Sequence, residues 1–225
     1  MSKYLIINAD DFGISHEENM AVSELYQEGK ITSVSVMAGA HAYEEAVDII
    51  KKLHMDSVGV HLYVTSEYQK EDCIYKLSGM TCSDKLLNGE IFPPKFTLSE
   101  DNVLAVCDES KAQIEKVIGS GINISHLDNH MYALWPAKQP DFLEHACKLC
   151  VEYKIPAIRL CAKIKEQDKY FSPVYSGRIN RLYARSIIGS YSLKSSDYVF
   201  LMSQGRDSDF SDDAMLHNFR NFLER

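Results

Sequence analysis

Residues 5–13 read Leu5-Ile6-Ile7-Asn8-Ala9-Asp10-Asp11-Phe12-Gly13, a short apolar run that leads into two adjacent carboxylates and a glycine. The apolar residues predict a strand over Tyr4–Asn8, and the glycine permits a sharp turn. Ligands and metals of α/β proteins lie at the carboxyl ends of such strands. Because neighbouring carboxylates repel each other, a cation is the simplest partner for Asp10 and Asp11. The alternative is that either residue caps the helix that follows.

A second β-like stretch, residues 57–65, carries a histidine at its centre. The alternation of side chains predicts a strand over Val58–Tyr63, with one face formed by Gly59, His61, Tyr63 and Thr65. Imidazole is the commonest metal ligand in proteins, which makes His61 a candidate ligand. A histidine within a strand is more often a hydrogen-bonded core residue than a metal ligand, so this stretch alone does not establish a metal site.

The third stretch, residues 122–132, holds three side chains of metal-ligand type within five positions, His126, Asp128 and His130. If the stretch is extended, these three share a face with Tyr132. If it is helical, the two histidines stand one turn apart. Both geometries gather ligand types, so the stretch favours a metal site over a polar loop.

These motifs and one further segment, taken in order, resemble those of the YdjC-type carbohydrate deacetylases: Asn8–Gly13, Lys30–Met37, Gly59–Leu62 with Thr65, and His126–His130. The similarity spans Tyr4 to about Gly205. The resemblance implies an α/β fold, a single-domain (β/α)-barrel-like arrangement with a mostly parallel sheet. It also implies a metal-dependent hydrolase that removes N-acetyl groups from amino sugars or chito-oligosaccharides.

The resemblance also implies roles for individual residues. Asp11, His61 and His130 would hold one divalent metal ion, and Asp10 would be the general base. An aspartate with two histidines suits zinc and several other divalent metals. The resemblance narrows the choice to magnesium or zinc. Asp128 is expected to orient a ligand histidine.

Family members usually carry a His-Pro-Gly segment near the C-terminal end, whose histidine would protonate the leaving amine. The matching stretch, Phe200–Gly205, contains no histidine. The proton donor is therefore expected to be Asp10, which can return the proton it takes, with His126 or Tyr132 as alternatives. His126 could instead be a metal ligand. Two other functions stay open, a catalytically impaired metal-binding homologue and a metal-dependent sugar phosphoesterase, although the motifs hold no basic residue for a phosphate.

Several side chains near the motifs are candidate substrate contacts. Aromatic rings stack on sugar rings, and an arginine can bind sugar hydroxyls or a phosphate. The candidates are Phe12, Tyr63, Tyr132, Trp135 and Arg159. Core packing of the aromatic residues, and an ion pair for the arginine, are the alternatives.

The composition of the 225-residue chain predicts an ordinary globular enzyme, with 45% hydrophobic and 25% charged residues. A net charge of −8 argues against nucleic acid and anionic membranes as partners. The expected partner is a small carbohydrate, and a homodimer would be common for such a fold. The sequence has no signal peptide pattern and no apolar run that could span a bilayer, which predicts a cytoplasmic protein.

Strands and helices alternate along residues 1–225, which predicts one domain with a parallel sheet. The expected strands are Tyr4–Asn8, Ser33–Met37, Val58–Tyr63, Ile122–His126, Ala157–Leu160 and Tyr198–Met202. The expected helices are Glu17–Glu28, Tyr43–Leu53, Glu100–Ile118, Pro140–Tyr153 and Asp213–Leu223. Residues 66–98 are expected to form a loop excursion over the active face, and residues 173–192 show no regular pattern.

Six cysteines are present, and two of them form the C-x-x-C pair Cys147 and Cys150. This pair lies in a segment whose apolar residues recur at helical spacing. We therefore expect both thiols to be free and buried in a helix rather than to serve a redox or zinc site.

Overall fold

The computed structural model describes residues 4–66, 77, 79–80, 100–132, 140–160, 178–196, 199 and 220. Within these residues, four strands form a parallel sheet in sequential order, β1 (Asn8–Phe12), β2 (Ser33–Val36), β3 (Val58–Leu62) and β4 (Ile124–Asn129). The α/β class and the parallel sheet are thus as the sequence predicts.

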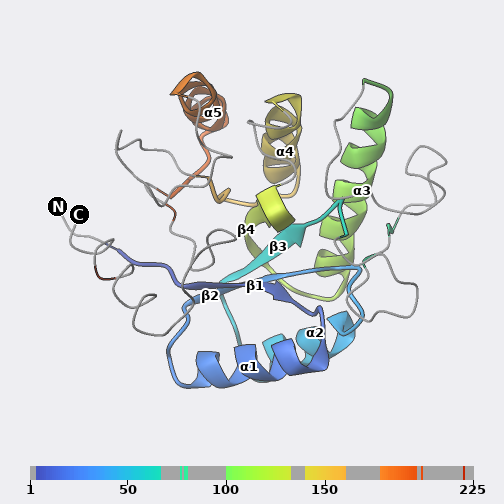
Figure 1. The fold of residues 1–225 in the computed structure, drawn as a ribbon, viewed down its shortest axis with the longest axis vertical. Helices are drawn as coiled ribbons and strands as arrows, with labels where there is room; N and C mark the ends of the chain where they lie inside the picture. The colour runs from blue at the N-terminus through green and yellow to red at the C-terminus, as the bar shows by residue number, and fades with distance from the viewer. Residues whose placement is uncertain are drawn as a thin grey trace, which may run out of the picture.

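Among the described residues, five α-helices connect or follow the strands, α1 (His16–Gln27), α2 (Tyr43–Lys52), α3 (Glu100–Gly119), α4 (Pro140–Glu152) and α5 (Arg178–Ser190). In Figure 1, α1 and α2 lie on one side of the strands, and α3, α4 and α5 lie on the other. A short 3-10 turn, η2 (His130–Tyr132), directly follows β4. No helix among the described residues is both long enough and apolar enough to cross a membrane.

The parallel series continues beyond β4. Leu127 forms a parallel bridge with Ile158, and Ala157 forms another with Lys194. Each extended segment therefore lies beside its predecessor in the sequence, which is the winding of a (β/α) barrel and not of a doubly wound sheet. This order confirms the barrel-like arrangement.

The central strands are covered on both faces. Every residue of β2 and β3 is buried, as is typical of parallel strands flanked by helices. The aliphatic residues of these strands join one large core with residues of α1, α2, α3, α4 and α5. The buried polar side chains of the same strands are Ser33, Ser35 and His61. These polar groups need partners, and their partners define the candidate site described below.

The first strand begins four residues later than predicted. Parallel pairing with β2 aligns Asn8 with Ser33 and Phe12 with Val36, so Asp10 and Asp11 lie inside the strand rather than after it. The apolar run before it is largely exposed, with Ile6 70% accessible. The prediction over Tyr4–Asn8 was wrong because the position of β2, not local hydrophobicity, sets which residues pair.

A second difference is α5, which forms where residues 173–192 showed no regular pattern. Its buried residues Ala184 and Ile188 are four positions apart, and Ile187 and Tyr191 pack against the same core. This is helical spacing, which the many tyrosines and arginines obscure in the sequence.

Most of the expected excursion over residues 66–98 lies outside the described residues. Within the described part, the buried carboxylate of Glu109 on α3 accepts the Met80 N–H with both oxygens, at 3.0 and 2.9 Å. The excursion is thus held to α3 at this point. The expected strand over Tyr198–Met202 and the expected helix over Asp213–Leu223 also fall outside, apart from Val199 and Arg220.

Candidate metal centre

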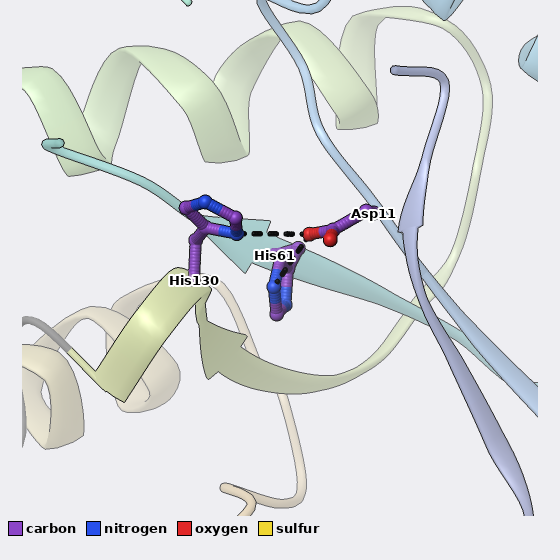
Figure 2. A group of neighbouring side chains, drawn as sticks. All are labelled: Asp11, His61 and His130. Atoms are coloured by element: carbon purple, nitrogen blue, oxygen red, sulfur yellow. Dashed lines mark hydrogen bonds and ion pairs between the residues drawn. The ribbon is translucent and has the colours of Figure 1, made fainter. Parts of the chain in front are cut away.

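The three ligands implied by the motifs meet at the carboxyl ends of their strands. Asp11 comes from β1, His61 from β3, and His130 from the turn that follows β4 (Figure 2). The Asp11 Oδ1 atom lies 3.1 Å from His61 Nε2 and 2.9 Å from His130 Nδ1. One ligand atom from each of the three residues lies within 4.8 Å of the others. Segments 119 positions apart in the sequence are thus brought into hydrogen-bond contact.

The backbone at Asp11 is unusual and explains where its carboxylate points. Neighbouring residues of a regular strand face opposite sides, so Asp10 and Asp11 would diverge. The β1–β2 register shifts between Ala9 and Phe12, and Asp11 adopts a left-handed φ of 58°. Aspartate tolerates this conformation better than most residues, at a cost of about 1–2 kcal/mol. The irregularity brings both carboxylates to the same polar cluster.

His61 is almost fully buried between two carboxylates. Its Nε2 faces Asp11, and its Nδ1 lies 2.6 Å from Asp128 Oδ1 and 3.5 Å from the Ser35 hydroxyl. Burial disfavours the charged imidazolium, but Asp128 and Asp11 outweigh this effect and raise the pKa of His61 to about 10. A proton on His61 balances the flanking carboxylates, which is the charge that a bound cation would supply.

Asp11 is correspondingly held as a carboxylate. Burial alone would raise its pKa, but hydrogen bonds from His130 and His61 dominate and hold the pKa of Asp11 well below its usual range. A carboxylate that is charged at neutral pH, beside two imidazole nitrogens, is a ligand set that divalent transition metals and zinc accept.

Asp10 points to a different partner from Asp11. The Arg159 guanidinium binds its two oxygens in a fork, with Nη1–Oδ1 2.6 Å and Nη2–Oδ2 2.9 Å. The Asn8 amide donates to Asp10 Oδ1 at 2.7 Å and to the Ser35 hydroxyl at 2.9 Å. Asp10 is therefore held in one orientation beside the ligand cluster. The sequence offered two roles for Arg159, a substrate contact or an ion pair. The structure places it in an ion pair with Asp10, the candidate base.

Asp128 links the candidate ligand His61 to Arg159, the arginine that binds Asp10. It is fully buried, with Oδ1 on His61 and with Oδ2 3.2 Å from Arg159 Nη2 and 3.6 Å from His126 Nε2. Burial would raise its pKa, but Arg159 and His61 hold the pKa of Asp128 well below the ordinary value. The His126 ring packs over Gly59, where a Cβ would overlap it. Gly59 is thus required for the position of His126.

Two groups of side chains have the spacing of a metal site among the described residues. The first is Asp11, His61 and His130, and the second is Asp10, His61 and Asp128. Arg159 already places its positive charge on Asp10 and Asp128, so the second group has its counter-ion. The first group has no guanidinium bound to Asp11 in the described structure, and its donor set fits a divalent metal. The fit therefore favours the first group.

The predicted aromatic contacts are placed less favourably. Phe12 and Tyr63 are fully buried in the structure, so neither ring lines an accessible surface. Phe12 packs in the main core, and Tyr63 packs in a smaller cluster with Met37, Ala40 and Leu77. The Tyr132 side chain and Trp135 lie outside the described residues.

Two polar residues of the site were not singled out from the sequence. Asn8 and Ser35 bridge Asp10 to the β2 strand, and Ser35 also approaches His61. A signal for Ser35 was present, because alternation within Ser33–Val36 places two serines on one face of a buried strand. A buried hydroxyl of this kind requires a polar partner across the sheet.

The C-x-x-C pair lies within α4, and both thiols are free and fully buried. Burial raises the pKa of Cys147 to about 12 and raises that of Cys150 still further above its usual range.

We expect iodoacetamide at pH 8 to leave both cysteines unmodified in the native protein and to modify both in urea, as read by peptide mass spectrometry. Rapid native labelling of either peptide would contradict this assignment.

The family model described as YdjC-like protein matches residues 4–223. A carbohydrate deacetylase of Brevibacillus brevis is 30% identical over 157 residues, which cover 68% of this chain and 57% of that protein. A carbohydrate deacetylase of Listeria welshimeri is 26% identical over 204 residues, which cover 88% and 80%. The chain thus spans 57% of the length of the Brevibacillus relative, and the same share of a Vibrio parahaemolyticus relative.

A solved structure has the same fold. The crystal structure of a cellobiose-phosphate cleavage protein from Enterococcus faecalis V583 superposes with a TM-score of 0.71 and 18% identity, covering 97% of this chain and 74% of that protein. At this identity the likeness shows the fold alone. The family match over nearly all of the sequence goes further, and it shows that the chain belongs to the YdjC-like protein family.

Proposed function

We propose that the protein is a metal-dependent hydrolase that removes N-acetyl groups from amino sugars or chito-oligosaccharides. The observation that carries the proposal is the meeting of Asp11, His61 and His130 beside a separately held carboxylate, Asp10. Curated relatives that are named carbohydrate deacetylases support the same reaction and a carbohydrate substrate. A homodimer and a cytoplasmic location remain predictions from the sequence.

Asp11, His61 and His130 would hold one divalent ion, magnesium or zinc. When bound, the ion would polarise the acetyl carbonyl and make water a better nucleophile. Asp128 fixes the His61 ring by accepting a hydrogen bond at Nδ1, which leaves Nε2 directed at the centre of the ligand cluster.

Asp10 would take the proton of the attacking water. Its direction is fixed by the two-pronged contact with Arg159 and by the hydrogen bond from the Asn8 amide. A general base must be ionised and within hydrogen-bond reach of the proton that it removes. The contacts with Arg159 and Asn8 support the second requirement, because they hold the Asp10 carboxylate in one orientation beside the candidate ligands.

The departing amine needs a proton to leave. Asp10 can return the proton that it took from water, so that one carboxylate serves both steps and no further donor is consumed. His126 is the alternative among the described residues, since it lies at the same cluster through Asp128. Tyr132 is a further alternative from the sequence.

The test is acetate release from an acetylated chito-oligosaccharide, measured before and after treatment with EDTA. We expect EDTA to abolish acetate release and added magnesium or zinc to restore it. His61→Ala is expected to lose both metal binding and turnover, because the ring lies between Asp11 and Asp128, whereas His145→Ala on α4 retains them. Phosphate release from a sugar phosphate would favour a phosphoesterase instead. Metal binding without turnover would favour an impaired homologue.

A further inference from the structure

Asn19 is a fully buried polar residue of α1 that reaches the turn after the two carboxylates. Its Oδ1 accepts the Gly13 N–H at 2.8 Å. Its Nδ2 donates to the Ala42 carbonyl at 3.0 Å and to Glu45 Oε2 at 2.8 Å. The amide thus uses both of its ends, and it joins the turn to α1 and to the start of α2.

Both backbone groups of Gly13 are held in this way. Asn19 binds its N–H, and the Ala42 N–H donates to its carbonyl at 2.8 Å. Gly13 has a φ of 102°, and a Cβ there would lie 3.3 Å from Tyr43 Cα. The turn therefore has one conformation that fits the packed ends of α1 and α2, and glycine is required to adopt it.

The conformation of Asp11 depends on this turn. The Asp11 carbonyl accepts the Ile14 N–H at 3.0 Å, so the Gly13 peptides lie inside the loop that this hydrogen bond closes. Asp11 also has a left-handed φ, which persists only where surrounding contacts enforce it. The direction of the Asp11 carboxylate toward His61 and His130 follows from that backbone.

We infer that Asn19 is a positioning residue for the metal centre, which it serves by fixing the backbone that aims Asp11. The inference rests on the proposed role of Asp11 as a ligand. No bond between Asn19 and the Asp11 carboxylate is required, because the effect passes through the Gly13 turn. A residue that only stabilised α1 would leave the ligand geometry of the folded protein unchanged.

The test is Co²⁺ binding to the whole protein with Asn19→Ala, measured by calorimetry well below the melting temperature. We expect the affinity to fall about 10- to 100-fold, the usual effect of losing a residue that orients a ligand. The visible absorption of bound Co²⁺ should also change, because it reports the coordination geometry. Unchanged affinity and an unchanged spectrum would overturn the inference.

A matched control is Ser23→Ala, which removes another buried polar group of α1, a hydroxyl that accepts a hydrogen bond from the Gln27 amide and does not contact the turn. It should bind Co²⁺ as the unaltered protein does. If Asn19→Ala does not fold, the double variant Asn19→Asp with Glu45→Gln is used instead. The carboxylate at position 19 can accept the Gly13 N–H, and the amide at position 45 can donate to that carboxylate, which reverses the present hydrogen bond between the two side chains. This double variant should recover affinity and spectrum, and failure to recover while folded would overturn the inference.

The measurements distinguish failure of the proposed function from failure of the inference about Asn19. If the unaltered protein itself does not bind Co²⁺ and does not lose acetate release with EDTA, the metal centre is wrong, and the role of Asn19 falls with it. If the unaltered protein binds Co²⁺ and Asn19→Ala binds it equally well, only the role of Asn19 is wrong.

Discussion

Replacement of Asp10 by Asn is expected to lower kcat for acetate release by about 100- to 10,000-fold, the range that a general base contributes. Asparagine keeps the shape of the side chain, and its oxygen can still accept a hydrogen bond from Arg159, but it cannot take a proton from water. Because Asp11 and the two histidines are untouched, the affinity for a divalent metal should change little. Kinetics and calorimetry on the same preparation measure the two effects.

The control for this change is Asp48→Asn, which removes one carboxylate from the exposed face of α2. It lowers the net negative charge by the same amount and should leave kcat unchanged. A low kcat in Asp48→Asn would point to a general effect of charge. Activity of Asp10→Asn close to that of the unaltered protein would show that another group removes the proton.

Replacement of Arg159 by Met is expected to lower the free energy of unfolding by about 3 kcal/mol, at the lower end of the range for breaking a buried ion pair. The loss comes mainly from Asp128, which is fully buried and, among the described side chains, keeps His61 and His126 as its ion-pair partners. Asp10 is partly exposed, so water compensates more of its loss. Urea unfolding of the protein in EDTA measures the change without a contribution from bound metal.

The same variant should also lose activity, because Asp10 is no longer held in one direction. Arg159→Lys separates charge from orientation, since lysine supplies a positive charge without the two-pronged contact. We expect it to recover part of the stability and little of the activity. Arg185→Met on the exposed side of α5 is the control. Equal stability of Arg159→Met and Arg185→Met would mean that the guanidinium contributes no net stabilisation.

Much of the architecture could be predicted because the central strands carry strong local signals. The buried Val and Ser alternation of β2 and the run around His61 in β3 each point to a strand without outside information. Their parallel pairing then follows from the helices between them. The meeting of Asp11, His61 and His130 was implied by family resemblance, because spacing along the chain cannot show that residues 119 positions apart converge.

The remaining features depend on contacts that a local pattern does not contain. Arg159 reaches Asp10 across 149 positions, and nothing near residue 159 distinguishes an arginine that binds substrate from one that binds a carboxylate. The start of β1 depends on the position of β2. The burial of Tyr63 depends on Gln113 of α3, whose side chain holds the Tyr63 backbone at both its N–H and its carbonyl. In each case the local sequence allows more than one structure, and tertiary contacts determine which one forms.

The site residues lie at different distances along the chain, so they leave the ribosome at different times. All three candidate ligands lie within the first 130 residues, whereas the guanidinium that holds Asp10 comes from residue 159. During synthesis, the ribosome releases the aspartate and both imidazoles before it releases this arginine. A nascent chain that ends before residue 159 would lack the Arg159 contact, so Asp10 is expected to reach its fixed orientation later than the three candidate ligands reach theirs.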